Sequence, residues 1–140
     1  MYRRVSRFGS YGIIIRDGKI LLTQKKNGPY RGLWGLPGGA IEFEESPEDC
    51  LKREVLEETA LLVENFELFC IATSNGRYFQ RSEHVDFHHI GIVYSVKITE
   101  QASDQMAEEE VRWSDYTCLD LSELTPFARE AVSKLKGTCR

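Results

Sequence analysis

The order of apolar and polar positions predicts a β-hairpin near the start of the chain. Mostly apolar residues fill positions 11–15 and 20–22, and the pair Asp17–Gly18 lies between the two runs. An Asp-Gly pair favours a two-residue type I′ turn, in which both central residues adopt positive φ. The two runs should therefore pair with each other as antiparallel strands.

Three further strands are predicted, over residues 61–74, 84–99 and 111–113. The polar segment 74–84 is expected to form a loop between the first two of them. In the strand over 84–99 the apolar positions change parity after Phe87, and a bulge near His88–His89 would explain the change.

Two helices complete the pattern. The first is expected to begin after Ser46, whose hydroxyl can cap it, with Pro47 at the first helical position. The second covers residues 121–136 and carries an apolar stripe at positions 124, 127, 128, 131 and 135. Strands and helices in this order predict one α/β or α+β domain over residues 1–140, with helices packed on a mixed sheet.

The charge of the chain narrows the classes of partner. Its 140 residues carry a net charge of −4, whereas a nucleic-acid or membrane surface usually requires a concentrated basic patch. Neither a nucleic-acid polymer nor a membrane is therefore expected as a partner. The small basic cluster of Arg3, Arg4 and Arg7 is either a solvated terminus or a rim that attracts phosphate.

Cysteine spacing and the lack of long apolar runs predict a cytoplasmic location. The four cysteines, at positions 50, 70, 118 and 139, include no C-x-x-C pair, which is more typical of reduced thiols than of a disulfide framework or a zinc site. No apolar run approaches the ~20 residues of a membrane helix, and the first ten residues lack the apolar region of a signal peptide.

The first predicted helix gathers carboxylates on one side. At 3.6 residues per turn, Glu54, Glu57 and Glu58 fall within an arc of about 100° beside the apolar positions Leu51 and Val55. Like charges at this spacing destabilise a helix, and a hard cation such as Mg²⁺, which prefers oxygen ligands, would reverse that effect. The alternative is a solvated acidic face.

A longer pattern surrounds these carboxylates. Residues 39–61 fit G-x5-E-x7-R-E-U-x-E-E-x-G-U, where U is a bulky aliphatic residue, through Gly39, Glu45, Arg53, Glu54, Val55, Glu57, Glu58 and Leu61. This pattern resembles the signature of the Nudix hydrolases, and the preceding "LWGLPGG" resembles the usual approach to it. Ala60 departs from the signature, which has Gly there, so we expect an altered helix exit and intact carboxylates.

The resemblance implies a Nudix-type α/β/α sandwich that hydrolyses a diphosphate linkage in a nucleoside diphosphate joined to another group. It implies that Mg²⁺ or Mn²⁺ is held by Glu54, Glu57 and Glu58, with help from the carbonyl of Gly38. Metal ions of this kind neutralise phosphate oxygens and lower the pKa of a bound water.

Two further roles follow from the same resemblance. Arg53 and Glu45 are expected to form a salt bridge that orients the helix. The general base is either Glu54 or a member of the run 108–110, and Glu109 of that run is expected to contribute a further metal ligand.

Substrate contacts are less well defined by the sequence. Arg31, Arg77 and Tyr78 are expected to bind substrate, although Arg77 could instead keep a hairpin tip soluble. Arg77 also stands where ADP-ribose hydrolases of the family often carry Pro. The rings that could stack on a base belong to Tyr30, Trp34, Phe43, Tyr78 and Phe79.

Two functions remain open at this point. One is an active hydrolase, a monomer or homodimer, acting on a nucleoside triphosphate, a nucleotide sugar or a dinucleoside polyphosphate. The other is a Nudix-like domain that senses a nucleotide without cleaving it. Degenerate sensor domains tend to lose the metal carboxylates, and this chain retains all of them, which favours the hydrolase.

Overall fold

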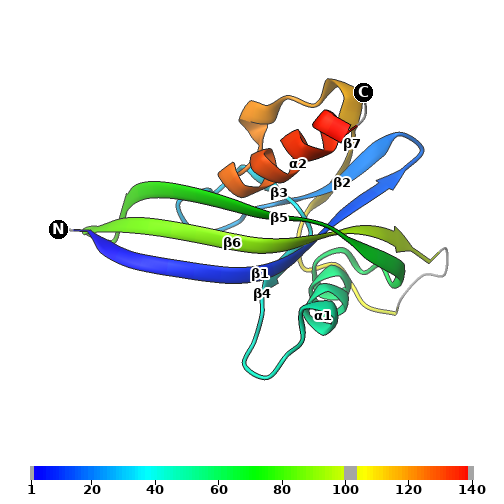
Figure 1. Cartoon of the computed structure of the whole chain (residues 1–140), viewed down its shortest axis with the longest axis horizontal. Helices are drawn as coiled ribbons and strands as arrows, with labels where there is room; N and C mark the ends of the chain where they lie inside the picture. The colour runs from blue at the N-terminus through cyan, green and yellow to red at the C-terminus, as the bar shows by residue number, and fades with distance from the viewer. Residues whose placement is uncertain (1, 100–103, 139–140) are drawn as a thin grey trace.

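A mixed sheet lies between two helices in this protein, whose computed structural model describes residues 2–99 and 104–138. Helix α1 (Pro47–Thr59) lies on one face of the sheet and helix α2 (Pro126–Thr138) on the other (Figure 1). The strand order is β3-β2-β1-β6-β5, with β4 paired to β1 and β7 paired to β2. The strands are β1 (Arg3–Arg16), β2 (Lys19–Gln24), β3 (Trp34–Gly35), β4 (Gly38–Ala40), β5 (Val63–Gln80), β6 (Glu83–Ile98) and β7 (Val111–Asp115). The predicted arrangement of helices on a mixed sheet is confirmed.

Strand β1 is the centre of the sheet. It pairs parallel with β6, from Arg3 opposite Val85 to Ile14 opposite Val96, and antiparallel with β2 and β4. The turn to β2 has positive φ at both central residues, 53° at Asp17 and 74° at Gly18, so the predicted hairpin is confirmed. Strand β1 begins at Arg3, eight residues before its apolar run, because the backbone from Arg3 onward pairs with β6.

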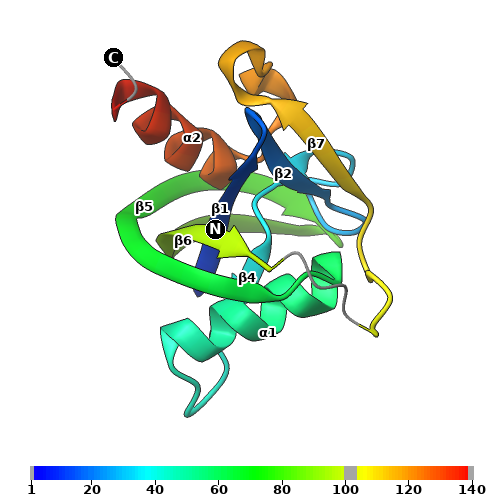
Figure 2. The same cartoon turned by 90° about the vertical axis from the view of Figure 1, so that its right-hand side faces the viewer.

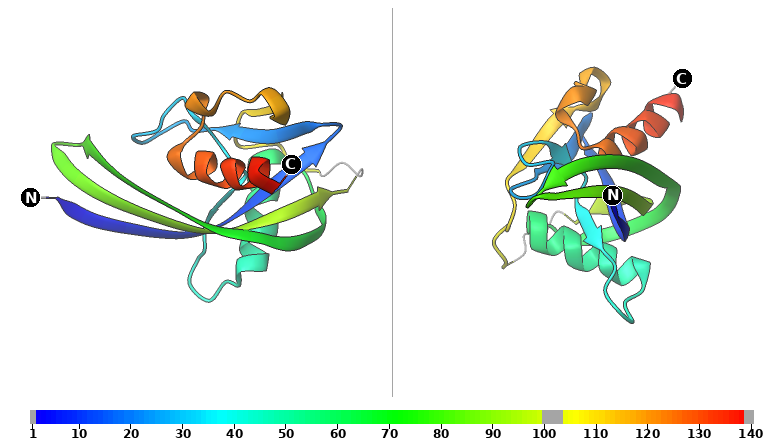
Figure 3. Two further views of the ribbon diagram at one scale, coloured as in Figure 1. Left: turned by 45° about the horizontal axis from the view of Figure 1, so that its top comes forward. Right: turned by 90° about the vertical axis from the view of Figure 1, so that its left-hand side faces the viewer.

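Two predictions about β5 and β6 were wrong. The segment 74–84 is not a loop, because both strands continue through it and turn only at Arg81–Ser82. Together with β1 they form the curved extension seen in Figure 3. No bulge lies at His88–His89, which pair in register with Asn75 and Ser74, and the register shifts are near Val63 and Leu68 instead.

The apolar positions of β6 change parity because different parts of the strand pack against different helices, and not because of a bulge. Val93 of β6 packs in the cluster that includes Phe127 and Ala131 of α2. Val96 packs in the other cluster, with Leu51 and Val55 of α1. Since α1 and α2 cover opposite faces, as Figure 2 shows, apolar residues at the two ends of β6 point to opposite sides.

Four positions of the predicted apolar stripe are at most 4% exposed, namely Leu124 just before α2 and Phe127, Ala128 and Ala131 within it, whereas Leu135 is half-buried. The helix itself begins later than predicted, because residues 121–123 form a separate 3₁₀ turn. No helix among residues 2–99 and 104–138 is long and apolar enough to cross a membrane. Cys50, Cys70 and Cys118 are free thiols, and Cys139 lies outside the described residues.

Candidate functional site

Helix α1 begins after Ser46 as predicted, but the altered exit expected from Ala60 was wrong. The hydroxyl of Ser46 accepts a hydrogen bond from the Asp49 N–H at 3.1 Å, which caps the first turn. Ala60 adopts φ 62° and ψ 17°, and its N–H donates to the carbonyl of Leu56 at 2.9 Å. An alanine therefore takes the left-handed conformation that usually favours glycine at a helix exit.

Arg53 contacts several carboxylates at once. Its Nε and Nη2 donate to the two carboxylate oxygens of Glu45 at 2.6 and 2.9 Å, which is the predicted ion pair. Its Nη1 also lies 2.8 Å from Glu54 Oε1 and 3.3 Å from Glu57 Oε2, two contacts that the sequence did not predict. The Arg53 guanidinium lowers the pKa of Glu45 to about 2.

Glu58 is the most enclosed carboxylate of the helix. The N–H of Gly38 donates to Glu58 Oε1 at 3.0 Å, so Gly38 contacts this residue through its amide group. Burial raises the pKa of Glu58 to about 8, and the charges of Glu54 and Glu109 act in the same direction. A side chain at Gly38 would meet the carbonyl oxygen of Ser10 at 2.1 Å, at a φ of 144°, so only glycine suits this position.

The loop before β7 delivers a further carboxylate. The amides of Glu108 and Glu109 donate to the carbonyls of Glu57 and Glu58 at 3.0 and 3.3 Å, which caps the last turn of α1. This contact places Glu109 beside Glu58, whereas Glu108 and Glu110 are exposed. Glu109 Oε2 is buried and has no hydrogen-bond partner among the described residues.

The donor set at this helix suits a hard divalent cation, although the side chains do not enclose one. Within the described part of the chain, no three acidic, histidine or cysteine side chains form a group that could hold a metal ion. Arg53 holds Glu54 and Glu57, and Gly38 holds Glu58. Burial is the main cause of the raised pKa of Glu58, but the charges of Glu54 and Glu109 also raise it, and Glu109 Oε2 has no described partner. A cation would neutralise these carboxylates.

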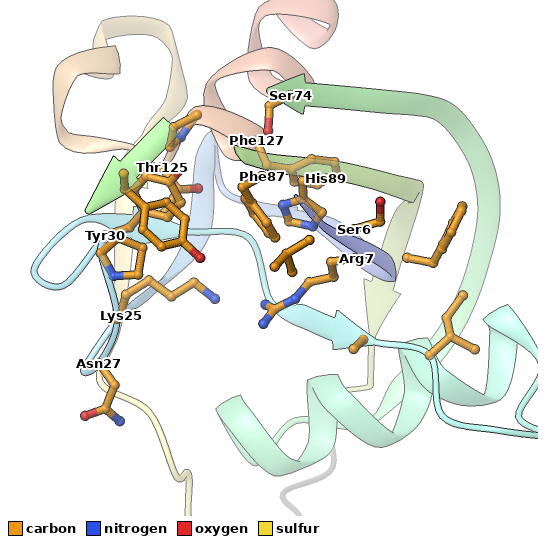
Figure 4. Close-up of a pocket in the computed structure, with 18 residues that line it drawn as sticks. Ser6, Arg7, Lys25, Asn27, Tyr30, Ser74, Phe87, His89, Thr125 and Phe127 are labelled. Carbon is orange, nitrogen blue, oxygen red and sulfur yellow. The ribbon is translucent and has the colours of Figure 1, made fainter. Parts of the chain in front are cut away.

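An aromatic pocket of about 530 Å³ lies beside the carboxylates (Figure 4). Lys25 and Ala40 line its edge, and Lys25 also lowers the pKa of Glu58 through its charge, so pocket and helix adjoin. Its aromatic side chains are Phe8, Tyr30, Tyr78, Phe87, His89 and Phe127.

His89 is an uncharged part of this aromatic wall. Its Nε2 lies 2.7 Å from the hydroxyl of Tyr11, and its ring stacks on Phe127 at 4.2 Å between centroids. Burial lowers the pKa of His89 to about 4, and the charges of Arg7 and Lys25 add to the effect. The ring is therefore neutral at pH 7. No local pattern of residues distinguishes His89 from His88.

The structure brings only one of the three predicted substrate residues to the pocket. Tyr78 lines it, with its ring 6.3 Å from that of Tyr30. Arg77 points to the other face of the sheet, where its Nε lies 3.8 Å from Asp86 and its guanidinium 4.3 Å from the Tyr2 ring. Arg31 is exposed and lies outside the pocket lining.

The remaining aromatic candidates also lie apart from the pocket. Phe43 and Phe79 are 94% and 63% exposed, and neither lines it. Trp34 packs beneath Arg112, with 4.4 Å between the guanidinium and the ring centroid. The pocket instead takes Arg7 and Lys25, which the sequence did not identify as substrate contacts; only the basic cluster at residues 3–7 pointed to Arg7.

Known proteins share this fold and this pattern. The structure resembles the crystal structure of a MutT NUDIX hydrolase from Burkholderia pseudomallei, with a TM-score of 0.74, 29% identity, and coverage of 94% of this chain and 98% of that one. An uncharacterised Nudix hydrolase of Bacillus subtilis, YvcI, is 31% identical over 117 residues, which are 81% of this chain and 69% of that protein.

A third relative matches over a shorter region. The ADP-ribose pyrophosphatase of Methanocaldococcus jannaschii is 42% identical over 66 residues, which are 47% of this chain and 39% of that protein. The match therefore spans less than half of that relative. The model of the NUDIX domain matches residues 6–135, nearly the whole described fold. The chain belongs to the Nudix hydrolase family.

Proposed function

We propose that this protein is a metal-dependent pyrophosphohydrolase that cleaves a diphosphate linkage in a nucleoside diphosphate joined to another group. The observation that carries the proposal is the position of Glu58 and Glu109, two adjoining carboxylates beside a pocket with aromatic walls. Carboxylates suit a metal that binds phosphate, and aromatic rings suit a nucleobase. One site thus offers both ends of a nucleotide a partner.

Glu54, Glu57, Glu58 and Glu109 would hold Mg²⁺ or Mn²⁺, together with the carbonyl of Gly38. Bound there, the metal would neutralise phosphate oxygens and lower the pKa of the attacking water. Arg53 holds Glu54 through Oε1 and Glu57 through Oε2, so the other oxygen of each carboxylate would be available to the ion. The bidentate pair with Glu45 keeps Arg53 in place beside them.

We assign the general base to Glu109. Its buried Oε2 has no described hydrogen-bond partner, so it can accept a proton without breaking an existing contact. As the water oxygen forms a bond to phosphorus, its proton passes to Glu109, and the bridging P–O bond breaks with its electrons on the leaving phosphate. Glu54 is the alternative base, but its Oε1 already accepts a hydrogen bond from Arg53 at 2.8 Å.

The pocket supports a nucleoside as the bound end of the substrate. Nucleoside triphosphates, nucleotide sugars and dinucleoside polyphosphates all present a base that could stack on Tyr30 or Phe87. The relative from Methanocaldococcus jannaschii, named as an ADP-ribose pyrophosphatase, adds ADP-ribose to this set.

A sensor that binds a nucleotide without cleaving it is the second candidate. The observation that favours it is the engagement of Glu54 and Glu57 by Arg53, because the described carboxylates do not enclose a metal ion. The two functions differ in one measurable respect, since only the hydrolase releases phosphorylated products.

The test is a panel of nucleoside triphosphates, nucleotide sugars, dinucleoside polyphosphates and ADP-ribose, assayed with Mg²⁺, with Mn²⁺ and with EDTA. We expect metal-dependent turnover of at least one class. Glu109→Gln should lower kcat by at least ~10²-fold, while the matched change Glu108→Gln, at an exposed neighbour, should leave it near the wild-type value. Binding of a nucleotide with no turnover of any class would support the sensor and overturn the hydrolase.

A further inference from the structure

Two cations face each other across the mouth of the aromatic pocket. Arg7 comes from β1, where it pairs with His89 of β6, and Lys25 follows the end of β2. Figure 4 shows their side chains entering the pocket from different sides, with the cationic ends pointing toward one another. The backbone of Lys25 is held by two hydrogen bonds, from its N–H to the Leu33 carbonyl and to its carbonyl from the Gly32 N–H, both 2.9 Å long.

Both cations lie at the boundary between the pocket and the carboxylates. The charge of Lys25 lowers the pKa of Glu54 and of Glu58, which places it close to both. The guanidinium of Arg7 lies beside the Tyr11 hydroxyl and opposes the rise in the Tyr11 pKa that burial causes. The charge of Glu58 acts on Tyr11 in the opposite direction and raises its pKa, so both Arg7 and the carboxylate helix influence this hydroxyl.

The pocket contains no negative charge to balance these cations. None of the 18 residues that line it is Asp or Glu. Among residues 2–99 and 104–135, no acidic side chain forms an ion pair with Arg7 or Lys25, whereas Arg3, Arg53, Arg77 and Arg112 all do so with acidic partners. His89, which belongs to the aromatic wall, is neutral and adds no charge of either sign.

An anion would convert this arrangement from repulsive to attractive. Two like charges that point at one space repel each other, and a group with several negative oxygens between them removes the repulsion. Guanidinium and ammonium groups form their strongest hydrogen bonds with phosphate oxygens. The carboxylates on one side and the aromatic rings on the other leave room at this boundary for the phosphates that join a base to the reacting centre.

We propose that Arg7 and Lys25 form a clamp for the diphosphate of the substrate, and that Arg7 determines the preference for substrates with two or more phosphates. This inference rests on the proposed function, and it adds a site on β1 that lies outside the carboxylate helix. The base enters the aromatic pocket, the diphosphate passes between the two cations, and the reacting phosphorus reaches the carboxylates. A nucleoside monophosphate has a single phosphate, which cannot occupy the clamp and the carboxylate site at the same time.

Binding of a probe that cannot be hydrolysed tests the clamp separately from catalysis. Methylenediphosphonate, in which carbon replaces the bridging oxygen of diphosphate, would be titrated calorimetrically with Mg²⁺ present. We expect Arg7→Met to weaken binding by at least ~10-fold, as for the loss of a hydrogen bond between charged groups. Arg7→Lys should recover part of the loss, and the wild-type Kd should rise with KCl more steeply than that of Arg7→Met.

Arg4→Met is the matched control. It removes the same charge three residues away on the same strand, but Arg4 lines a shallow depression on the other face with Asn75 and His88. Equal weakening by Arg4→Met and Arg7→Met would overturn the clamp, because it would show a general charge effect. Wild-type protein that does not bind the probe at about 1 mM, the upper end of ordinary KM values, would also overturn it. Probe binding without turnover of any nucleotide would leave the clamp in place and refute the hydrolase.

Thermal midpoints of all variants check that the fold is intact. Arg7 is exposed and lies on a strand that pairs through its backbone, so its replacement should leave the midpoint near the wild-type value. With substrate, Arg7→Met should raise KM for a nucleoside triphosphate more than it lowers kcat. It should also bring the Kd values of a nucleoside diphosphate and the corresponding monophosphate closer together. An unchanged ratio would contradict the assigned preference.

Discussion

Arg53 reaches both carboxylate oxygens of Glu45, from Nε at 2.6 Å and from Nη2 at 2.9 Å. The same guanidinium contacts Glu54 and Glu57 on its own helix. The pair thus joins the segment before α1 to the carboxylate face of the helix. Removal of the Arg53 side chain should consequently affect both the thermal stability and the turnover.

Arg53→Ala should lower the thermal midpoint and the turnover in the same variant, because it leaves partly buried carboxylates without a partner.

The ion pair between Arg53 and Glu45 should also make stability depend on pH. The pKa of Glu45 is lowered to about 2 from an ordinary value of 4.5, so its contribution to stability is present above pH 4.5 and is lost as the pH falls toward 2. The difference in midpoint between wild type and Glu45→Gln should therefore shrink over that range. A constant difference, or the same effect in Glu44→Gln, would contradict the assignment.

Ala60→Gly should stabilise the protein, by up to about 1 kcal/mol, because glycine adopts positive φ without the steric cost that alanine incurs. The φ of 62° at Ala60 sets the sign of this prediction. Denaturant midpoints at equal m-values would measure it. Ala131→Gly is the control of opposite sign, since Ala131 is buried inside the right-handed α2 and should lose about 1 kcal/mol. A destabilised Ala60→Gly variant would show that the exit does not carry this strain.

Glu57→Gln should lower kcat by at least ~10²-fold, because charge held at the metal is worth several kcal/mol in phosphoryl chemistry. Mg²⁺ at millimolar concentration should raise the thermal midpoint of the wild type by binding the folded state, and should raise that of Glu57→Gln much less. In EDTA the variant should keep a midpoint close to that of the wild type, since relief of the like-charge repulsion with Glu54, three residues earlier, offsets a weaker contact with Arg53. Near-normal turnover would show that this carboxylate face is only a solvated surface.

Glu58→Gln should stabilise the metal-free protein at high pH only. The folded pKa of Glu58, about 8, lies above the ordinary 4.5, so the contribution of this carboxyl to stability is fully present below pH 4.5 and is lost as the pH rises from 4.5 through 8. Gln keeps an acceptor for the Gly38 N–H without the charge. In EDTA, the variant should melt at least ~3 °C above the wild type at pH 8.5 and at the same temperature at pH 4.5. An equal gain at both values would assign the effect to packing.

The local part of the site was readable from the sequence, and the long-range part was not. Helical periodicity alone brought Glu54, Glu57 and Glu58 to one side, and Asp17–Gly18 specified its own turn. His89 and Arg7 meet only because β1 and β6 pair in parallel, and no local pattern encodes that register. Arg77 was expected in a loop, but the strand continues and alternation turns its side chain to the far face.

The choice of Glu109 within the acidic run illustrates the same limit. Three adjacent glutamates are equivalent by composition, and the amide bonds from residues 108 and 109 to the end of α1 decide which of them faces inward. Ala60 was the reverse case. Its departure from the family pattern suggested a different helix exit, yet the backbone keeps the left-handed conformation and accepts the cost of a methyl group.

The parallel pairing of β1 with β6 has a consequence for the newly made chain. Arg3 lies opposite Val85, so at ~5–20 residues per second the ribosome needs roughly 4–16 s to deliver the partner of a strand that has already emerged. During that interval the backbone groups of β1 that later pair with β6 are unpaired and could pair with a strand of another nascent chain. This part of β1 carries three positive charges, on Arg3, Arg4 and Arg7. Charged side chains on an unpaired strand discourage its pairing with other chains. Arg7, which we assign to substrate binding, would thus also discourage pairing with other chains before the fold is complete.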